Sequence, residues 1–195
     1  MESRVKEEQK RTLLTKYETR EEQDGQKVIA GYFAVFNSET ELWQGAYESV
    51  DPGAFDDTLG NDIRALTNHN ATLVLGRSKA GTLKLSKDSH GLWGEISINE
   101  NDTDALNLYE RVKRGDVDQC SFGFNILDEE TEWRDDGTVK WTLKKVDLHE
   151  VSVCTFPAYA DTGVQARHRE VEQYREKQAE QWKHDITSRL KGGCK

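Results

Sequence analysis

Two side chains in this sequence could carry acyl-transfer chemistry, Ser121 and His69. A serine hydroxyl is a weak nucleophile until a base takes its proton, and the base needs a third group to orient it. His69 lies between Asn68 and Asn70 at the end of an apolar stretch, where a loop would present its ring. By spacing alone, His69 is more typical of a hydrogen-bonded surface histidine. Ser121 is equally typical of a strand hydroxyl bonded to the backbone.

Cys120 is a rival nucleophile. Neighbouring residues of a strand point to opposite faces, so only one of Cys120 and Ser121 can enter a given site. The three cysteines, Cys120, Cys154 and Cys194, lack the spacing of metal ligands, and their odd number is typical of a reducing compartment. The sequence contains no Gly-rich phosphate loop and no His-x-x-x-His pair. The sequence thus shows no recognisable metal-binding or phosphate-binding motif.

Short strands dominate the elements that must position these residues. Alternating or β-branched runs, separated by turn residues such as Asp24-Gly25 and Asp136-Gly137, predict strands. They cover residues 14–22, 28–36, 63–69, 82–86, 92–98, 119–126, 129–133, 138–143 and 146–156. Gly123 inside one of these strands indicates a bulge or a close backbone approach.

Two helices are predicted among the strands. Asp51 followed by Pro52 predicts a short helix over 51–59, because proline is favoured at the first helical position. Apolar residues at helical spacing predict a second helix over 103–114, which Gly115 would end. The pattern favours an α+β fold: a strand-dominated, partly closed β-barrel with inserted helices.

Charge divides the chain into three predicted parts. The net charge is −9, but residues 12–166 hold 15 basic and 28 acidic residues, a net charge of −13. We expect 1–11 to be a charged extension, 12–166 the folded domain and 167–195 a charged helical or disordered tail. An acidic body repels phosphates, which argues against a nucleic-acid partner. No apolar run reaches ~18 residues and no signal peptide is visible, so no membrane partner is expected.

Five blocks, taken in order, resemble the prohead serine proteases of tailed bacteriophages, which are relatives of the herpesvirus capsid maturation proteases. Each block is short, but their joint order and spacing are specific, and together they extend over about residues 14–166. The blocks are residues 28–37, 48–55, 65–77, 115–124 and 148–159. The resemblance implies a herpesvirus-protease-like fold.

The resemblance also implies catalytic roles. Ser121 would be the nucleophile and His69 the general base. Glu150, the acidic residue of the Leu-x-Glu-Val-Ser block, is the favoured third member, and an alternative is that it is a buried strand carboxylate paired with Arg77. The herpesvirus relatives use a second histidine, which makes His149 the rival. Since neighbouring strand residues face opposite ways, at most one of the two can point at His69.

Donors for an oxyanion are expected near the nucleophile. Backbone N–H groups around Ser121, Phe122 and Gly123 could supply one, and Gly123 would let the substrate backbone approach. Arg77 is a second candidate, because the herpesvirus relatives use an arginine near the site. An ordinary salt bridge explains Arg77 equally well.

The resemblance implies peptide-bond hydrolysis without a cofactor, inside the procapsid that assembles in the host cytoplasm. The substrates would be the scaffolding segment of the major capsid protein or a separate scaffold protein, and then the protease itself. Homo-oligomers are possible partners. We expect the tail after residue 166 to be dispensable for catalysis but needed for entry into the shell.

Three alternatives remain open at this stage. The chain could be a catalytically inert capsid-assembly scaffold of the same fold. It could be a cysteine hydrolase that uses Cys120. It could also be a small-molecule-binding barrel, in which case mutations of His69 and Ser121 would have uncorrelated effects.

Overall fold

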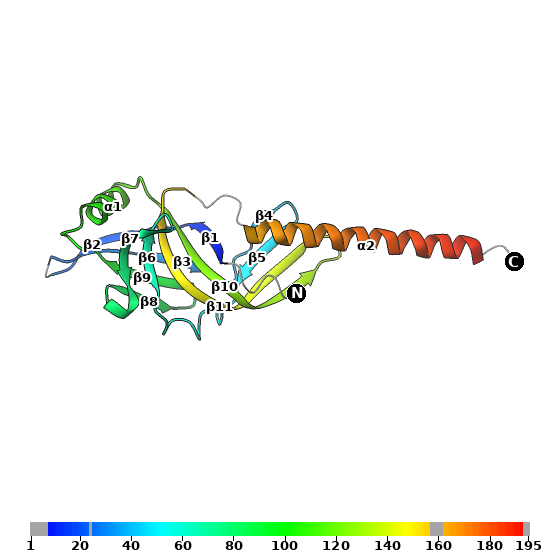
Figure 1. Cartoon of the computed structure of the whole chain (residues 1–195), viewed down its shortest axis with the longest axis horizontal. Helices are drawn as coiled ribbons and strands as arrows, with labels where there is room; N and C mark the ends of the chain where they lie inside the picture. Colours follow the sequence, from blue (N-terminus) through cyan, green and yellow to red (C-terminus); the bar gives the residue numbers. More distant parts are fainter. Residues whose placement is uncertain (1–7, 24, 157–161, 193–195) are drawn as a thin grey trace. The chain divides into compact units, whose positions relative to one another are not determined.

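The structure, a computed structural model, describes residues 8–23, 25–156 and 162–192, and most of them outside the C-terminal helix form two β-sheets (Figure 1). The larger sheet contains β1 (Gln9–Leu14), β4 (Thr40–Trp43), β5 (Ala46–Val50), β6 (Arg64–Thr67), β7 (Asn70–Arg77), β10 (Gln119–Trp133) and β11 (Val139–Cys154). The smaller sheet contains β2 (Glu18–Glu21), β3 (Lys27–Val35), β8 (Leu83–Lys87) and β9 (Gly91–Ser97). The mixed, strand-rich α+β class predicted from the sequence is confirmed.

A long hairpin of β10 and β11 forms the centre of the larger sheet, and Figure 1 shows these two strands curving side by side. The strands have 15 and 16 residues. Each merges two of the predicted short strands, and the turn between them lies around Gly137, whose φ is +81°. The hairpin therefore carries both Ser121 and Glu150.

Both sides of this hairpin are paired over the segment that holds Ser121. Strand β1 runs antiparallel to β10, with Thr12 opposite Ser121. On the other side, β11 pairs in parallel with β5 through its first half and with β6 through its second half, where Glu150 lies opposite Arg64. The strand that carries the candidate nucleophile is thus an interior strand.

The apolar core takes side chains from both sheets and from α1. Alternation along β10 sends Cys120, Phe122 and Phe124 into this core, where each is at most 1% exposed. Ser121 and Gly123 consequently face the opposite side of the sheet. The alternation separates the packed face of β10 from the face that holds the candidate nucleophile.

Helix α1 (Thr103–Arg114) has the bounds predicted from the sequence. The side chain of Asp102 caps its start by accepting the backbone N–H groups of Asp104 and Ala105 at 2.9 and 3.2 Å. Gly115, with φ of +86°, ends it in the left-handed conformation that glycine favours.

The predicted helix over residues 51–59 is wrong, because this segment forms a series of tight turns. Successive bonds join residues three apart, from the N–H of Ala54 to the carbonyl of Asp51 and from that of Asp56 to that of Gly53. The Asp51 carboxylate accepts the Gly53 N–H and is held by an ion pair with Lys144 of β11. Asp51 therefore stabilises a turn against the sheet instead of capping a helix.

The strand pairing does not demonstrate a barrel. Over the described residues, pairing in the larger sheet runs from β1 to β4, with β6 and β7 branching from β11, and pairing in the smaller sheet runs from β2 to β8. Neither path returns to its first strand. The partly closed barrel stays a prediction.

The chain divides into two compact units, residues 1–159 and 160–195. The second unit contains α2 (Thr162–Gly192), so the predicted boundary at 166/167 falls inside this helix, and the predicted boundary at 11/12 falls inside β1. Neither α1 nor α2, as far as the structure describes them, is long and apolar enough to cross a membrane.

Candidate active site

Ser121 occupies the middle of a three-strand segment. Its backbone lies opposite Thr12 of β1 and opposite Ser152 of β11. Directly paired residues of antiparallel strands project to the same side, so Ser152 and Ser121 share one face of the sheet. The Ser121 side chain is fully buried there.

His69 lies on the tight turn between β6 and β7. Both turn residues have left-handed backbones, with φ of +49° for Asn68 and +58° for His69. The turn is attached to β11, because the Asn68 N–H donates to the Val153 carbonyl at 3.0 Å and the Asn68 side-chain oxygen accepts the Thr155 N–H at 2.9 Å. These bonds fix the turn, and with it the imidazole, beside the strand that carries Glu150.

Glu150 contacts the imidazole directly. Its Oε1 lies 2.5 Å from His69 Nδ1, and its side chain is only 7% exposed. This contact engages the Nδ1 side of the imidazole and leaves Nε2 outside it. The structure therefore brings together His69 and Glu150, which are 81 residues apart in sequence.

Gly123 makes room for this carboxylate. It lies opposite Glu150 in the ladder, and a Cβ added at Gly123 would be 2.5 Å from Glu150 Oε1. Real Cβ contacts are never that short. Close approach of a substrate backbone was the predicted reason for this glycine, whereas the structure shows the Glu150 side chain in that space.

A β-bulge separates the roles of His149 and Glu150. Gly123 pairs with Glu150 but the next residue, Phe124, pairs with Leu148, which leaves His149 as the extra residue of β11. Bulges re-aim the side chains around them. At this bulge it is the carboxylate of Glu150, the favoured candidate, that meets the His69 ring.

Two atoms of the site are buried without a hydrogen-bond partner among the described residues, Ser121 Oγ and His69 Nε2. Buried polar atoms are nearly always bonded, so such exceptions mark strain or chemistry. A nucleophilic oxygen and a basic nitrogen are the two atoms that a serine hydrolase must leave available to each other and to substrate.

The predicted oxyanion donors around Ser121 lie within the sheet and the core. The Phe122 side chain is 1% exposed and stacks on Phe124 with ring centroids 4.9 Å apart, so it belongs to the core. The backbone of Ser121, Phe122 and Gly123 lies in ladders on both sides. An oxyanion role for these N–H groups stays a prediction, and it requires one ladder to release a hydrogen bond.

Arg77 does not pair with the Glu150 carboxylate and forms a surface ion pair. Its guanidinium binds the Asp62 carboxylate through two nitrogens and lowers the pKa of Asp62 to about 2. Arg77 is 44% exposed at the end of β7, and strand β6 separates β7 from β11. The salt-bridge interpretation describes this arrangement, and the alternative pairing of Arg77 with Glu150 is wrong.

Cys120 points to the other face of β10. Its thiol is fully buried and donates to the Tyr32 carbonyl at 3.1 Å. Burial, together with the nearby Cys154 thiol, raises the pKa of Cys120 well above its ordinary value. A buried thiol that resists ionisation is a poor nucleophile, so the geometry favours Ser121 over Cys120.

Two residues that contribute to the site, Ser152 and Asn68, were not predicted from the sequence. Ser152 Oγ donates to Glu150 Oε2 at 2.6 Å and accepts the His69 backbone N–H at 3.2 Å. The two-residue period of a strand places Ser152 on the same face as Glu150, and this signal could have identified it. Asparagine tolerates the left-handed conformation, so Asn68 between two strands was a local signal for the tight turn.

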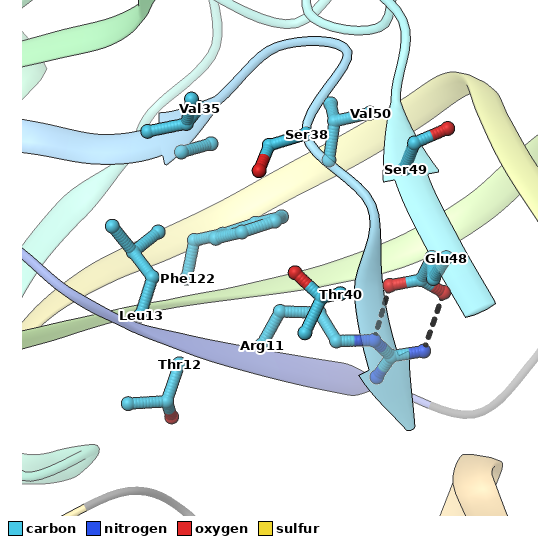
Figure 2. A pocket seen from close by; sticks show the side chains of 11 residues that line it. Arg11, Thr12, Leu13, Val35, Ser38, Thr40, Glu48, Ser49, Val50 and Phe122 are labelled. Carbon is cyan, nitrogen blue, oxygen red and sulfur yellow. Dashed lines mark hydrogen bonds and ion pairs between the residues drawn. The ribbon is translucent and has the colours of Figure 1, made fainter. Parts of the chain in front are cut away.

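A cavity of about 200 Å³ lies between β1, β3, β4 and β5, on the Phe122 side of β10 (Figure 2). Arg11 and Glu48 form a buried ion pair in it, with nitrogen to oxygen distances of 2.5 and 2.9 Å. Ser121, His69 and Glu150 do not line this cavity. Among the described residues, no group of three His, Cys, Asp or Glu side chains is arranged to hold a metal ion.

Comparison with known proteins gives concordant results. Residues 15–177 match the family model of the caudovirus prohead serine proteases. The prohead protease of Enterobacteria phage HK97 is 30% identical over an alignment of 149 residues, and the match covers 72% of this chain and 60% of that relative. This chain therefore spans less than two thirds of the length of that relative.

One solved structure has a similar fold. The capsid assembly protease of bacteriophage T4 matches with a TM-score of 0.50 over 76% of this chain and 97% of the other, at 8% identity. At that identity the likeness concerns the fold. With the family match over most of its length, the chain belongs to the caudovirus prohead serine protease family.

Proposed function

We propose that this chain is a serine endopeptidase in which Ser121 is the nucleophile, His69 the general base and Glu150 the residue that orients the base. The observation that carries the proposal is the 2.5 Å contact between Glu150 Oε1 and His69 Nδ1, beside two buried atoms, His69 Nε2 and Ser121 Oγ, that lack partners among the described residues. The contact occupies one ring nitrogen and leaves the other to act as a base.

In the proposed reaction these residues act in turn. His69 Nε2 takes the Ser121 proton as Oγ attacks the scissile carbonyl carbon, and then gives that proton to the leaving amine. A water molecule, deprotonated by the same nitrogen, attacks the acyl-enzyme; the nitrogen then returns the proton to Ser121 Oγ as the ester bond breaks, which releases the new carboxylate. The Glu150 carboxylate stabilises the imidazolium that forms in each half of the reaction.

Access to Ser121 is part of the proposal. Its side chain is fully buried in the described arrangement, and strands flank it on both sides. A peptide carbonyl must reach Oγ for attack, so the face that holds Ser121 must open before substrate binds. Activity would then depend on how readily this face opens.

The names of the relatives, a prohead protease and a capsid assembly protease, support a proposal for the biological substrate. We propose that the substrate is the scaffolding segment of the major capsid protein or a separate scaffold protein, and then this chain itself. Cleavage would occur inside the procapsid, in the host cytoplasm. Contacts with capsid or scaffold proteins, and with other copies of the protease, would bring the chain there.

Co-expression with the capsid proteins of the same phage tests this function. Intact-mass spectrometry should show a shortened capsid or scaffold protein with the wild-type chain and the full-length protein with Ser121→Ala. Full-length capsid and scaffold proteins with both variants, in procapsids that contain the chain, would instead support the inert scaffold.

A further inference from the structure

Ser152 is a fully buried hydroxyl at the junction of the site's three main components. It lies directly opposite Ser121 in the β10–β11 ladder. Its Oγ donates to Glu150 Oε2 at 2.6 Å and accepts the His69 backbone N–H at 3.2 Å. One residue thus pairs with Ser121 through its backbone and binds, through its side chain, the Glu150 carboxylate and the turn that carries His69.

The bond to Glu150 fixes the carboxylate. Of its two oxygens, Oε1 contacts His69 Nδ1 and Oε2 accepts the Ser152 hydroxyl. With both oxygens bonded, the carboxylate plane cannot rotate without losing one partner. Without Ser152, Oε2 would lose this bond in a nearly closed environment, where an unpaired acceptor is unfavourable.

The bond to His69 holds the backbone of that residue and so positions its imidazole ring. His69 has φ of +58°, a conformation that non-glycine residues adopt only when their surroundings hold them there. The Ser152 hydroxyl receives the N–H of that residue. The same oxygen therefore stabilises the strained turn and the carboxylate that the ring must meet.

We propose that Ser152 is a positioning residue that holds Glu150 and His69 in register for proton transfer, an inference that rests on the proposed protease function. Ser152 touches neither substrate nor the reacting atoms in this role. Its hydroxyl is committed to a carboxylate, which also distinguishes it from Ser121, whose Oγ has no partner among the described residues.

A second buried hydroxyl provides a matched control. Ser49 is 4% exposed on β5 of the same sheet, and its Oγ lies 3.3 Å from Thr142 Oγ1 of β11. It makes the ordinary structural contact of a strand hydroxyl. Substitutions at Ser49 therefore report the effect of losing a buried hydroxyl that is not connected to the base.

The test uses the full chain with Ser152→Ala and Ser152→Cys, beside Ser49→Ala and Ser49→Cys. The first readout is the low-field proton resonance of the His69 Nδ1–H in protein with ¹⁵N-labelled histidine, assigned with His69→Ala. The second is kcat and KM for cleavage of a peptide spanning the mapped cut site. Cysteine keeps the side-chain volume with a weaker donor, so it remains informative if Ser152→Ala fails to fold.

We expect both Ser152 variants to shift or broaden the resonance and to lower kcat by ~10²-fold with KM changed less than about twofold, because a small misplacement of a catalytic group has that effect. The Ser49 variants should leave the resonance and kcat unchanged. An unaltered resonance in folded Ser152→Cys, or equal losses of kcat at Ser152 and Ser49, would overturn the proposal. If the wild-type chain cleaves nothing, the resonance alone decides the role of Ser152, and the protease function fails separately.

Discussion

The two faces of strand β10 differ in whether their polar atoms have hydrogen-bond partners. On the core face, Phe122 and Phe124 stack on each other, and even the Cys120 thiol has a carbonyl partner. On the other face, Ser121 Oγ is buried without a partner among the described residues, as is His69 Nε2 on the turn between β6 and β7. One face contributes packing and the other retains reactive atoms.

This difference teaches that stability and reactivity are separated by a single residue step. A buried polar atom without a partner is unfavourable by about 1–3 kcal/mol. The core face, with its apolar side chains, supplies the free energy that lets the other face keep such atoms. Substitutions on the two faces should therefore affect different measurements.

The largest expected effect is on catalysis, at the polar face. Ser121→Ala and His69→Ala should each lower kcat by up to ~10⁶-fold, because residues that act as a unit lose nearly everything together. Ser121→Ala should not lower the free energy of unfolding, since it removes a hydroxyl that has no partner among the described residues. Cleavage assays and urea denaturation measure the two effects.

Phe122→Ala is the comparison from the other face. It should lower the free energy of unfolding by about 3–5 kcal/mol, as expected for a buried phenylalanine.

Processing retained in either folded Ser121→Ala or folded His69→Ala would show that these residues are not the catalytic pair.

The next effect separates neighbours on β11. Glu150→Gln should lower kcat by ~10⁴-fold, because the amide can no longer stabilise the imidazolium or fix its tautomer. His149→Gln should change kcat less than about threefold, since the bulge leaves the ring contact to Glu150. The reverse order in the same assay would assign the third role to His149.

Gly123→Ala should have a smaller effect. The new Cβ would meet Glu150 Oε1 at 2.5 Å and displace the carboxylate from His69, so kcat should fall by ~10²-fold. Gly60→Ala is the matched control, because a Cβ there meets nothing within 4 Å. Full activity in Gly123→Ala would show that the carboxylate position is not critical.

The smallest effect on activity is expected at Cys120. Cys120→Ala should keep kcat within about twofold while lowering the free energy of unfolding by ~1 kcal/mol through lost packing. Peptide cleavage and chemical denaturation provide the two values. Inactive Cys120→Ala with an unchanged unfolding curve would instead point to the thiol.

Local patterns predicted the elements whose stability is local. The capped helix α1 and the turn at Gly137 follow from nearby residues. Strand β1 was missed beyond its last residue, because the sequence QKRTLL has little alternation and the strand forms by pairing with β10. The turns after Asp51 were mistaken for a helix, because Lys144, which holds that carboxylate, is far along the chain.

Residue types and the family resemblance predicted which residues would form the site, but not the contacts that assemble it. The pair of His69 and Glu150 depends on a left-handed turn, a bulge and a glycine on a third strand, contacts that join residues from 27 to 83 positions apart. Strand periodicity could have identified Ser152 from Glu150. Strand periodicity could not have shown that Arg77 binds Asp62 and not Glu150.

The central claim, that His69 activates Ser121, is tested most directly by labelling with a fluorophosphonate in cells that assemble procapsids, followed by peptide mass mapping. The wild-type chain should carry the phosphonyl group on Ser121, and His69→Ala should lose that label. Labelling of Ser152 in place of Ser121, or equal labelling of Ser121 in His69→Ala, would contradict the account.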